Sequence, residues 1–420
     1  MLQKILEYEL KPALGCTEPM AFALCAASAR AYAHGAVARI GIEASAAMIK
    51  GVQYVKIPNS GGRCGGRMAC ALGALAGNAA DGMQVFQRVQ AEDAAAAERM
   101  IAAGQVRIEL KEDVPRLWLR VTVTGSEGTG VAIVQDRHDN VAYLESDGNV
   151  LRDTRSAAEA EDAPDYGALS VETIWEFCTH APLARLARAE EAVRLNTALS
   201  EEGLRQGYGM QTGKTLTESG MLGGGTAMDA VCAGCAGVDA RMGGAPLAAM
   251  SNSGSGNQGV TCTAPVAAAG RRMGRSHEEI VRAAAAANLL TVFLKTRAGA
   301  DEGRIAPVCG AALAAGGAAG WIAMLRGDDA DCVERMLRTV LGNVCGMVCD
   351  GAKASCAAKI GLAVENALMA LELSLAGNVF QPGEGMTMED PEDTIAAVGR
   401  MGRVGMKSTD VEILNIMLGN

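Results

Sequence analysis

The spacing of apolar residues changes once along this chain, and that change limits the folds open to it. Short β-branched runs with alternating side chains fill much of the first 150 residues and predict strands. From about Leu169 onward the apolar spacing is helical. The pattern therefore predicts an α+β fold, with a small N-terminal sheet-containing domain at residues 1–165 and a larger, mostly α-helical domain at residues 166–420.

Several elements of the first domain are predicted with bounds. An apolar helix is expected over Pro19–Ala33, with Thr17 as its N-cap and Gly35 just past its end. Turn signals at residues 138–140 and at Asp147-Gly148 separate the later strands and predict an antiparallel meander. The expected strands are Arg39–Ile42, Val52–Ile57, Val106–Leu110, Leu117–Val123, Gly130–Val134 and Val141–Leu144.

An acidic, alanine-rich stretch at residues 152–168 contains Pro164 and is typical of a linker or loop. Beyond it, long segments have apolar residues at helical spacing, which predicts a bundle of packed helices. The clearest of these helices are Val171–Arg188, Glu190–Gln206, His277–Thr296, Cys332–Val348 and Ala357–Ala376.

Composition excludes several classes of function. The net charge is −10 and aromatic residues are 3% of the chain, so neither a phosphate-tracking groove nor a base-stacking surface for nucleic acid is expected. Ile305–Leu325 has no charged residue, yet it is rich in Ala and Gly and contains Pro307, which favours a buried helix over a membrane span. The Ala/Gly-rich helices leave room for a homodimer interface, although the oligomeric state is not readable.

Thirteen cysteines, an odd number in a long chain, favour reduced thiols over a disulfide framework. The first residues do not resemble a signal peptide, so a cytoplasmic location is expected. Most of the thiols are expected to be small core residues. Cys232-Ala-Gly-Cys235 has metal or redox spacing but lies in an apolar Ala/Gly run, where core packing is the better interpretation.

The segment Cys349-Asp-Gly-Ala-Lys-Ala-Ser-Cys356, together with Cys309, offers three thiols and no obvious fourth. A structural metal site is closed by four protein ligands, whereas a catalytic site keeps one position open. Cys345 lies one helical turn before Cys349 and is a rival ligand. Spacing alone leaves two alternatives open, a metal site and a set of ordinary buried cysteines.

A run of small and amide-bearing residues, Ser251-Asn-Ser-Gly-Ser-Gly-Asn-Gln-Gly259, lies between two helical segments. Such a loop presents N–H groups, hydroxyls and amides to a small carboxylate or phosphate, and the alternative is a flexible linker. The turn Ile57–Gly62 is a second candidate, unless it is only a tight turn. The candidate binding side chains are Ser251, Asn252, Ser253, Ser255, Asn257, Gln258, Asn59 and Ser60.

Gly15-Cys16-Thr17-Glu18-Pro19 places a thiol just before a predicted helix. The N–H groups and dipole at a helix N-terminus favour the thiolate and lower its pKa, which would suit a base or a nucleophile. An inert buried cysteine is the alternative. Gly209–Thr215 resembles a phosphate loop, but only three residues separate its glycines and Tyr208 stands where the first glycine belongs, so nucleotide binding is not expected.

Four separated motifs resemble the L-cysteine desulfidase family, which is related to the α-subunit of iron–sulfur L-serine dehydratases. The resemblance implies that Cys309, Cys349 and Cys356 hold a [4Fe–4S] cluster with one open iron, that Cys16 is catalytic, and that the Ser251–Gly259 loop binds substrate. The motifs are Ala13-Leu-Gly-Cys-Thr-Glu-Pro19, Asp239-Ala-Arg-Met-Gly-Gly244, Met250-Ser-Asn-Ser-Gly-Ser-Gly-Asn-Gln-Gly259 and Gly346-Met-Val-Cys-Asp-Gly351.

The implied reaction is the β-elimination of L-cysteine to pyruvate, ammonia and sulfide, without pyridoxal phosphate. An open iron would stabilise the sulfur leaving group, and Cys16 would take the Cα proton, with Lys353 or Glu18 as less favoured bases. L-Serine or another β-substituted amino acid is the alternative substrate, and a non-catalytic iron–sulfur or thiol sensor is the alternative class. Some relatives close the resting cluster with a terminal cysteine, whereas this chain ends Asn415-Ile-Met-Leu-Gly-Asn420, which leaves the fourth ligand open.

Overall fold

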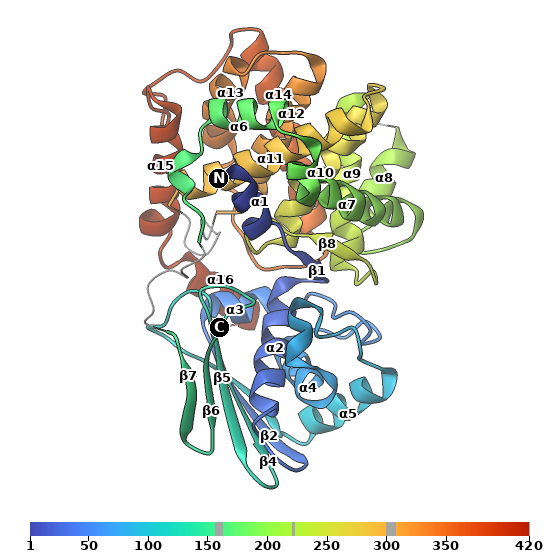
Figure 1. Ribbon diagram of the computed structural model, residues 1–420, viewed down its shortest axis with the longest axis vertical. Helices are drawn as coiled ribbons and strands as arrows, with labels where there is room; N and C mark the ends of the chain where they lie inside the picture. The colour runs from blue at the N-terminus through green and yellow to red at the C-terminus, as the bar shows by residue number, and fades with distance from the viewer. Residues whose placement is uncertain (156–162, 221–222, 300–307, 420) are drawn as a thin grey trace.

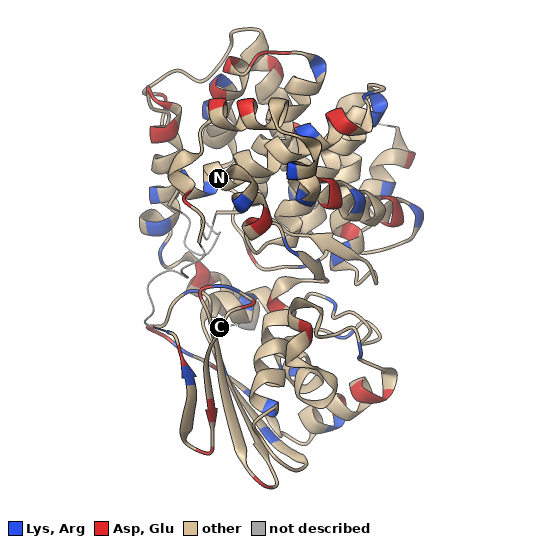
Figure 2. Ribbon diagram, in the orientation of Figure 1, with Lys and Arg blue, Asp and Glu red and all other residues tan. Residues whose placement is uncertain are grey.

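The computed structural model describes residues 1–155, 163–220, 223–299 and 308–419, and it has two parts (Figure 1). The lower part in that view holds a six-stranded sheet and the helices packed on it, and the upper part is almost entirely helical. The predicted α+β class is confirmed. Acidic and basic residues are interspersed along both parts (Figure 2).

The sheet has the strand order β3-β2-β4-β5-β6-β7, with β2 parallel to β3 and the remaining pairs antiparallel. The predicted meander is therefore present. Asp147 and Gly148 have φ values of 48° and 82°, the conformation that a tight two-residue hairpin turn requires. The strands are β2 (Val37–Ala44), β3 (Val106–Leu110), β4 (Trp118–Gly125), β5 (Thr129–Gln135), β6 (Val141–Ser146) and β7 (Asn149–Asp153).

One face of the sheet is covered by α2 (Thr17–Arg30), and α4 (Gly66–Ala76) packs behind it. The inward-facing residues of β4 alternate with half-buried ones, as a sheet with one covered face requires. Gly130 of β5 lets α2 approach closely, because a Cβ there would lie 2.0 Å from the carbonyl oxygen of Ala29. The remaining helices of this part are α3 (Ala46–Val52), η1 (Ala79–Gln84) and α5 (Ala91–Ala102).

Several predicted elements differ from the structure, and the helix expected over Pro19–Ala33 ends at Arg30. Val52–Ile57 is not a strand, because Ser45 caps α3 through the N–H of Met48 and the helix runs to Val52. Cys16, not Thr17, occupies the cap position of α2. The helix expected over Val171–Arg188 breaks where Ala181 is extended before Pro182, as a residue preceding proline prefers. The helix expected over Cys332–Val348 ends at Val344.

The helical part surrounds α12 (Ala311–Arg326), whose residues are almost all buried. A Cβ at Gly317 would lie 2.7 Å from the carbonyl oxygen of Ala287, so glycine permits the close approach of α11 (His277–Arg297). The prediction of a buried helix is confirmed over residues 311–325, and residues 305–307 lie outside the described ones. The described helices include none with the length and apolarity that a bilayer crossing requires.

The other helices of this part are long and pack mostly against one another. The predicted linker overlaps β7 at its start, and residues 156–162 lie outside the described ones. The helices are η2 (Tyr166–Ala168), α6 (Val171–His180), η3 (Leu183–Leu186), α7 (Ala187–Arg205), α8 (Thr212–Ser219), α9 (Thr226–Met242), α10 (Gly256–Arg272), α13 (Asp331–Val344), α14 (Cys356–Leu375), α15 (Pro391–Arg400), η4 (Met401–Gly405) and α16 (Thr409–Leu418).

The two ends of the chain each cross to the other part. The N-terminal helix α1 (Leu2–Glu9) packs among the upper helices, whereas α16 packs against α3 of the lower part (Figure 1). Strand β1 (Pro12–Leu14) pairs antiparallel with β8 (Ala248–Met250). Because the pairing is antiparallel, the loop that follows β8 lies beside the residues that precede β1, and the N–H groups of Ser251 and Ser253 donate to the carbonyl oxygens of Lys11 and Glu9.

The side chain of Asn196, in α7, stabilises the β1–β8 pairing through hydrogen bonds to the backbone. Its side-chain amide donates to the carbonyl oxygens of Met250 and Gly259 at 3.2 and 3.0 Å, and its Oδ1 accepts from the N–H of Met250 at 2.9 Å. Asn196 is fully buried. The side chain therefore supplies three hydrogen bonds where water has no access.

We expect Asn196→Leu to lower the free energy of unfolding by about 1–3 kcal/mol, because it leaves buried backbone groups without partners. Urea denaturation of the reduced protein measures the change. Thr197→Ala, one residue along the same helix and partly exposed, is the control and is expected to change stability far less. Equal effects of the two substitutions would contradict the role given to Asn196.

Candidate functional site

A small cavity of about 90 Å³ lies where the two parts of the molecule meet. Its lining comes from the start of α2, from α3, from the C-terminal end of α9, from the start of α10, and from the segments that lead into α12 and α14. Cys16, Cys309, Cys349 and Cys356 all line it. Segments separated by more than 300 residues in sequence therefore form one site.

Backbone pairing holds two of the cysteines in place. Val308 and Val348 form an antiparallel bridge, and the N–H of Cys309 donates to the carbonyl oxygen of Met347 at 2.7 Å. Cys349 follows this bridge directly. Cys345, the rival ligand, sits at the C-terminal end of α13 and is not part of the cavity lining. The structure thus brings the predicted three cysteines together and leaves the fourth out.

The turn between Cys349 and Cys356 is stabilised by charge. Asp350 forms ion pairs with Lys353, at 2.6 Å, and with Lys359. Burial opposes ionisation, but hydrogen bonds and charge from these two lysines lower the pKa of Asp350 to about 2. Lys359 also donates to the carbonyl oxygen of Val348 at 2.9 Å. Together these bonds close the turn and place Cys356 as the first residue of α14.

Gly351 is required in this turn. Its φ is 96°, and a Cβ there would lie 2.5 Å from the carbonyl oxygen of Lys50. The turn therefore packs directly on the backbone of α3, in the other part of the molecule.

The donor set is of a kind that iron–sulfur clusters use, because cysteine thiolates hold such clusters. Burial first, and then the neighbouring Cys349 and Cys356, raise the pKa of the Cys309 thiol to about 12, so the three sulfurs are electrostatic neighbours. Within the described residues, no group of three or more His, Cys, Asp or Glu side chains is placed to hold one metal ion.

Cys16 is the N-cap of α2, but its surroundings differ from the expectation. Its Sγ donates to Oε2 of Glu18 at 2.8 Å, and both side chains are buried. Burial, followed by the charge of Glu18, raises the pKa of the Cys16 thiol, and the opposing charge of Arg241 does not compensate. The expectation of a lowered pKa was wrong, because burial and the nearby Glu18 carboxylate both disfavour the thiolate.

The Ser251–Gly259 loop divides into a structural half and a cavity half. Ser251 donates to the carbonyl oxygen of Lys11 at 2.7 Å, and the Asn252 amide donates to Asn288 at 3.0 and 3.1 Å. The hydroxyl of Ser253 donates to Asn252 at 2.9 Å. These three side chains hold the loop in place. The residues that line the cavity are Ser255, Asn257 and Gln258.

Arg241 also lines the cavity, and the sequence reasoning missed it. It lies one residue before the end of α9 and is only 3% exposed. Its Nη1 donates to Oδ1 of Asn257 at 2.7 Å. The signal was present, since Arg241 stands inside one of the four motifs, but nothing in the sequence placed α9 beside α10.

Two predicted residues stand apart from the cavity. Asn59 is exposed and donates to the carbonyl oxygen of Phe86 at 3.1 Å, and Ser60 donates to that of Ile57 at 2.7 Å. Neither belongs to the lining. Their turn packs beside Cys16, because Pro58 meets Gly15, where a Cβ would lie 2.6 Å from the proline Cγ. A role for them in binding substrate stays a prediction.

Comparison with known proteins shows the family of this chain. Residues 80–415 match the family model described as serine dehydratase alpha chain. The chain belongs to the serine dehydratase alpha chain family. Relatives named UPF0597 protein occur in Oleidesulfovibrio alaskensis, 37% identical over 99% of this chain and 96% of that protein, and in Lachnoclostridium phytofermentans, 34% identical over 99% and 98%. Another, in Photobacterium profundum, is 34% identical over 99% and 97%.

Membership of the serine dehydratase alpha chain family suggests a dehydratase or lyase-like enzyme.

Two other sequence patterns that resemble binding motifs have a structural role instead. Cys232 and Cys235 are buried within α9, as expected for core residues. The Gly209–Thr215 segment gives its N–H groups to a protein carboxylate instead of a phosphate, since Met210 and Gly213 donate to Asp239 at 3.2 and 3.0 Å.

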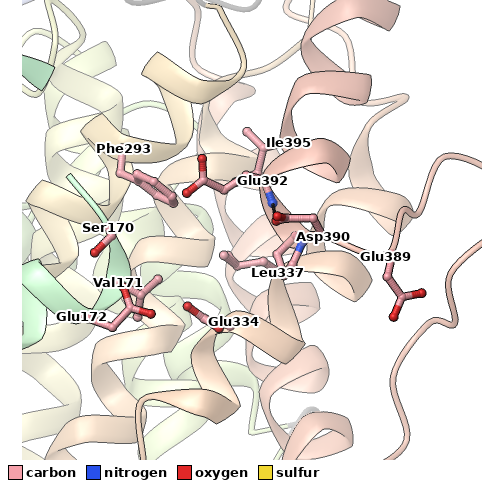
Figure 3. Close-up of a pocket in the computed structure, with 11 residues that line it drawn as sticks. Ser170, Val171, Glu172, Phe293, Glu334, Leu337, Glu389, Asp390, Glu392 and Ile395 are labelled. Carbon is pink, nitrogen blue, oxygen red and sulfur yellow. Dashed lines mark hydrogen bonds between the residues drawn. The ribbon is translucent and has the colours of Figure 1, made fainter. Parts of the chain in front are cut away.

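A second cavity, of about 470 Å³, is lined by acidic residues between α6, α13 and α15 (Figure 3). Burial first, and then the charge of Glu172, raise the pKa of Glu334. None of the candidate residues from the sequence lines this cavity. The carboxylates in its lining make this cavity unsuitable for an anionic ligand. They belong to Glu172, Glu334, Glu389, Asp390 and Glu392.

A buried cation ties the C-terminal helix to the cysteine segment. Lys50 is 3% exposed, forms an ion pair with Asp410 of α16, and donates to the carbonyl oxygen of Cys349 at 2.7 Å. Arg116 reaches the other oxygen of Asp410 at 3.0 Å. Asp410 therefore neutralises the lysine that positions Cys349.

We expect Asp410→Asn to lower the free energy of unfolding by about 1–3 kcal/mol, because the buried Lys50 charge loses its counter-charge. Lys50→Met in the Asp410→Asn background should recover part of the loss, since the unpaired charge is then gone. Chemical denaturation of the wild type, of Asp410→Asn, of Lys50→Met and of the double variant measures this. Additive destabilisation by the two substitutions would show that Lys50 and Asp410 act independently.

Proposed function

We propose that this chain is an iron–sulfur-dependent β-elimination lyase that converts L-cysteine and water to pyruvate, ammonia and hydrogen sulfide. The observation that carries the proposal is the shared cavity of Cys309, Cys349, Cys356 and Cys16, with the polar residues of the Ser251–Gly259 loop on its wall. Membership of the serine dehydratase alpha chain family supports a reaction of this class.

The proposed cofactor is a [4Fe–4S] cluster held by Cys309, Cys349 and Cys356. When bound, a cluster with one iron free of protein ligand supplies a Lewis acid for the sulfur leaving group. The reaction breaks the Cα–H and Cβ–S bonds and leaves aminoacrylate, which water hydrolyses to pyruvate and ammonia. This route needs no pyridoxal phosphate.

Cys16 is the proposed base. Its thiol proton is already directed to Glu18, so transfer to that carboxylate generates the thiolate that takes the Cα proton. Glu18 itself is the second candidate, because it lines the same cavity. Lys353 is less favoured, since its ammonium group is held in an ion pair with Asp350 and it is not part of the lining.

The cavity half of the loop is proposed to position the substrate. The Ser255 side chain caps α10 by accepting a hydrogen bond from the N–H of Gln258. The N-terminus of α10 faces the cavity. Asn257 and Gln258 stand in the first turn of that helix. Polar groups fixed in this way orient the Cα–H bond toward the base, which is a positioning contribution to the rate.

Cluster ligation is tested by anaerobic reconstitution of the wild type and single-cysteine variants. We expect the wild type to contain about four irons and four labile sulfides per chain, the composition of a [4Fe–4S] cluster. Cys309→Ala, Cys349→Ala and Cys356→Ala should each lose most of it. Cys345→Ala is the matched control and should retain it. A colourless wild-type protein without iron would refute the proposal.

The proposed base is tested by Cys16→Ser. We expect cluster absorption like that of the wild type and a loss of turnover of at least about 100-fold, the usual size of a general base contribution. Cluster content and sulfide release from L-cysteine are measured on the same samples. Wild-type protein that binds a cluster but turns over no amino acid would favour the second class of function, an iron–sulfur or thiol sensor.

L-Serine is the second candidate substrate, favoured by the family to which the chain belongs. Sulfur donors suit iron–sulfur centres better than a hydroxyl does, so we expect kcat/KM for L-cysteine to exceed that for L-serine. Parallel measurement of the two values decides between the two substrates.

The proposed iron–sulfur cluster and the thirteen free thiols suit a reducing compartment, and we propose a cytoplasmic location.

A further inference from the structure

Arg241 is an incompletely satisfied buried cation. Of its guanidinium donors, Nη1 bonds to Asn257, whereas Nε and Nη2 are buried and have no hydrogen-bond partner in the part of the chain that the structure describes. Leaving such donors unpaired is costly in the free protein. A guanidinium group in a cavity wall with two unpaired donors is suited to bind a ligand that supplies the missing hydrogen-bond acceptors.

The shape of the unpaired edge identifies the ligand chemistry. Nε–H and one N–H of Nη2 point the same way from the planar guanidinium, at the spacing of the two oxygens of a carboxylate. Asn257 fixes the opposite side of the group. Gly256 packs against it, because a Cβ at that position would lie 2.3 Å from Nε and 2.6 Å from Nη2.

A second unpaired group of opposite type lines the same cavity. Oε1 of Gln258 is buried and has no hydrogen-bond partner within the described ranges. Gln258 is packed against Gly310, where a Cβ would lie 2.1 Å from its Nε2. The oxygen can accept a hydrogen bond from an ammonium group.

We infer that Arg241 binds the α-carboxylate of the substrate through its Nε/Nη2 edge and that Gln258 accepts a hydrogen bond from the α-ammonium group. The site then selects α-amino acids by their zwitterionic end and leaves the β-substituent to face the cysteines. This inference rests on the proposed function for its substrate, but the binding groups are tested separately from turnover.

The experiment uses anaerobically reconstituted full-length protein and two half-substrates, 3-mercaptopropionate and cysteamine. The first has the thiol and carboxylate without the ammonium, and the second has the thiol and ammonium without the carboxylate. Affinity is measured by calorimetry, which requires no catalysis. Loss of a buried arginine–carboxylate pair costs several kcal/mol, so an affinity change on the order of 100-fold is expected.

We expect Arg241→Met to weaken 3-mercaptopropionate by that factor and to leave cysteamine unchanged. Gln258→Met should do the reverse. Gly256→Ala keeps the charge but displaces the guanidinium, and should weaken 3-mercaptopropionate to a smaller extent. Arg272→Met, which removes a 57% exposed arginine at the other end of α10, is the control and should change neither affinity.

Thermal unfolding separates a binding role from a structural one. A buried charge kept for a ligand lowers the stability of the free protein, so Arg241→Met should have a midpoint temperature equal to or above that of the wild type. If Arg241→Met weakens both half-substrates equally, or lowers the midpoint and leaves 3-mercaptopropionate unaffected, the inference is overturned. Wild type that binds 3-mercaptopropionate through Arg241 but turns over no amino acid refutes the proposed function alone.

Discussion

The antiparallel pairing of β1 with β8 is the contact on which the candidate site depends. It joins residues 12–14 to residues 248–250 and is held from behind by Asn196. Because the strands are antiparallel, Cys16 follows β1 at one end of the ladder, whereas the Ser251–Gly259 loop follows β8 at the other end, where Ser251 donates to Lys11. The ladder holds both segments, and each contributes residues to the lining of the same cavity. The β1–β8 pairing thus positions segments of the chain that form the site. The buried hydrogen bonds of the Asn196 side chain make a shift of its register costly.

Three basic residues line the cavity beside the cysteines, the half-buried Lys359 and the buried Lys50 and Arg241, and their charges are compensated to different degrees. Lys359 is paired with Asp350, and Lys50 with Asp410, so both serve to hold backbone carbonyls of the cysteine segment. Among the residues that the structure describes, Arg241 has one hydrogen-bond partner, the neutral Asn257. A fold optimised only for stability would not retain such a group, because burying a charge without full pairing is expensive. The difference distinguishes structural cations from one reserved for a ligand.

The sequence predicted what is local. Period-two runs located β2 to β6, and helical spacing located α7, α11 and α14. Local pattern could not show that Val52 ends a helix begun by the Ser45 cap, or that Pro182 divides a predicted helix, since both depend on competition between neighbouring signals. The direction of the Cys16 pKa was missed for a related reason. The position before a helix is visible in sequence, whereas the burial that raises the pKa of Cys16 comes from the packed fold.

The candidate site was only partly predictable, because its members come from six elements. The three cysteines and the cavity half of the polar loop could be named from motifs, but Lys50 and Asp410 are 360 residues apart and belong to no motif. The raised pKa of Cys16 does not argue against a catalytic role. A thiol that already donates to Glu18 can pass its proton to that carboxylate, and the thiolate so formed can take the Cα proton of a bound substrate. Desolvation keeps the thiol protonated until then, and this protects a reactive sulfur when no substrate is bound.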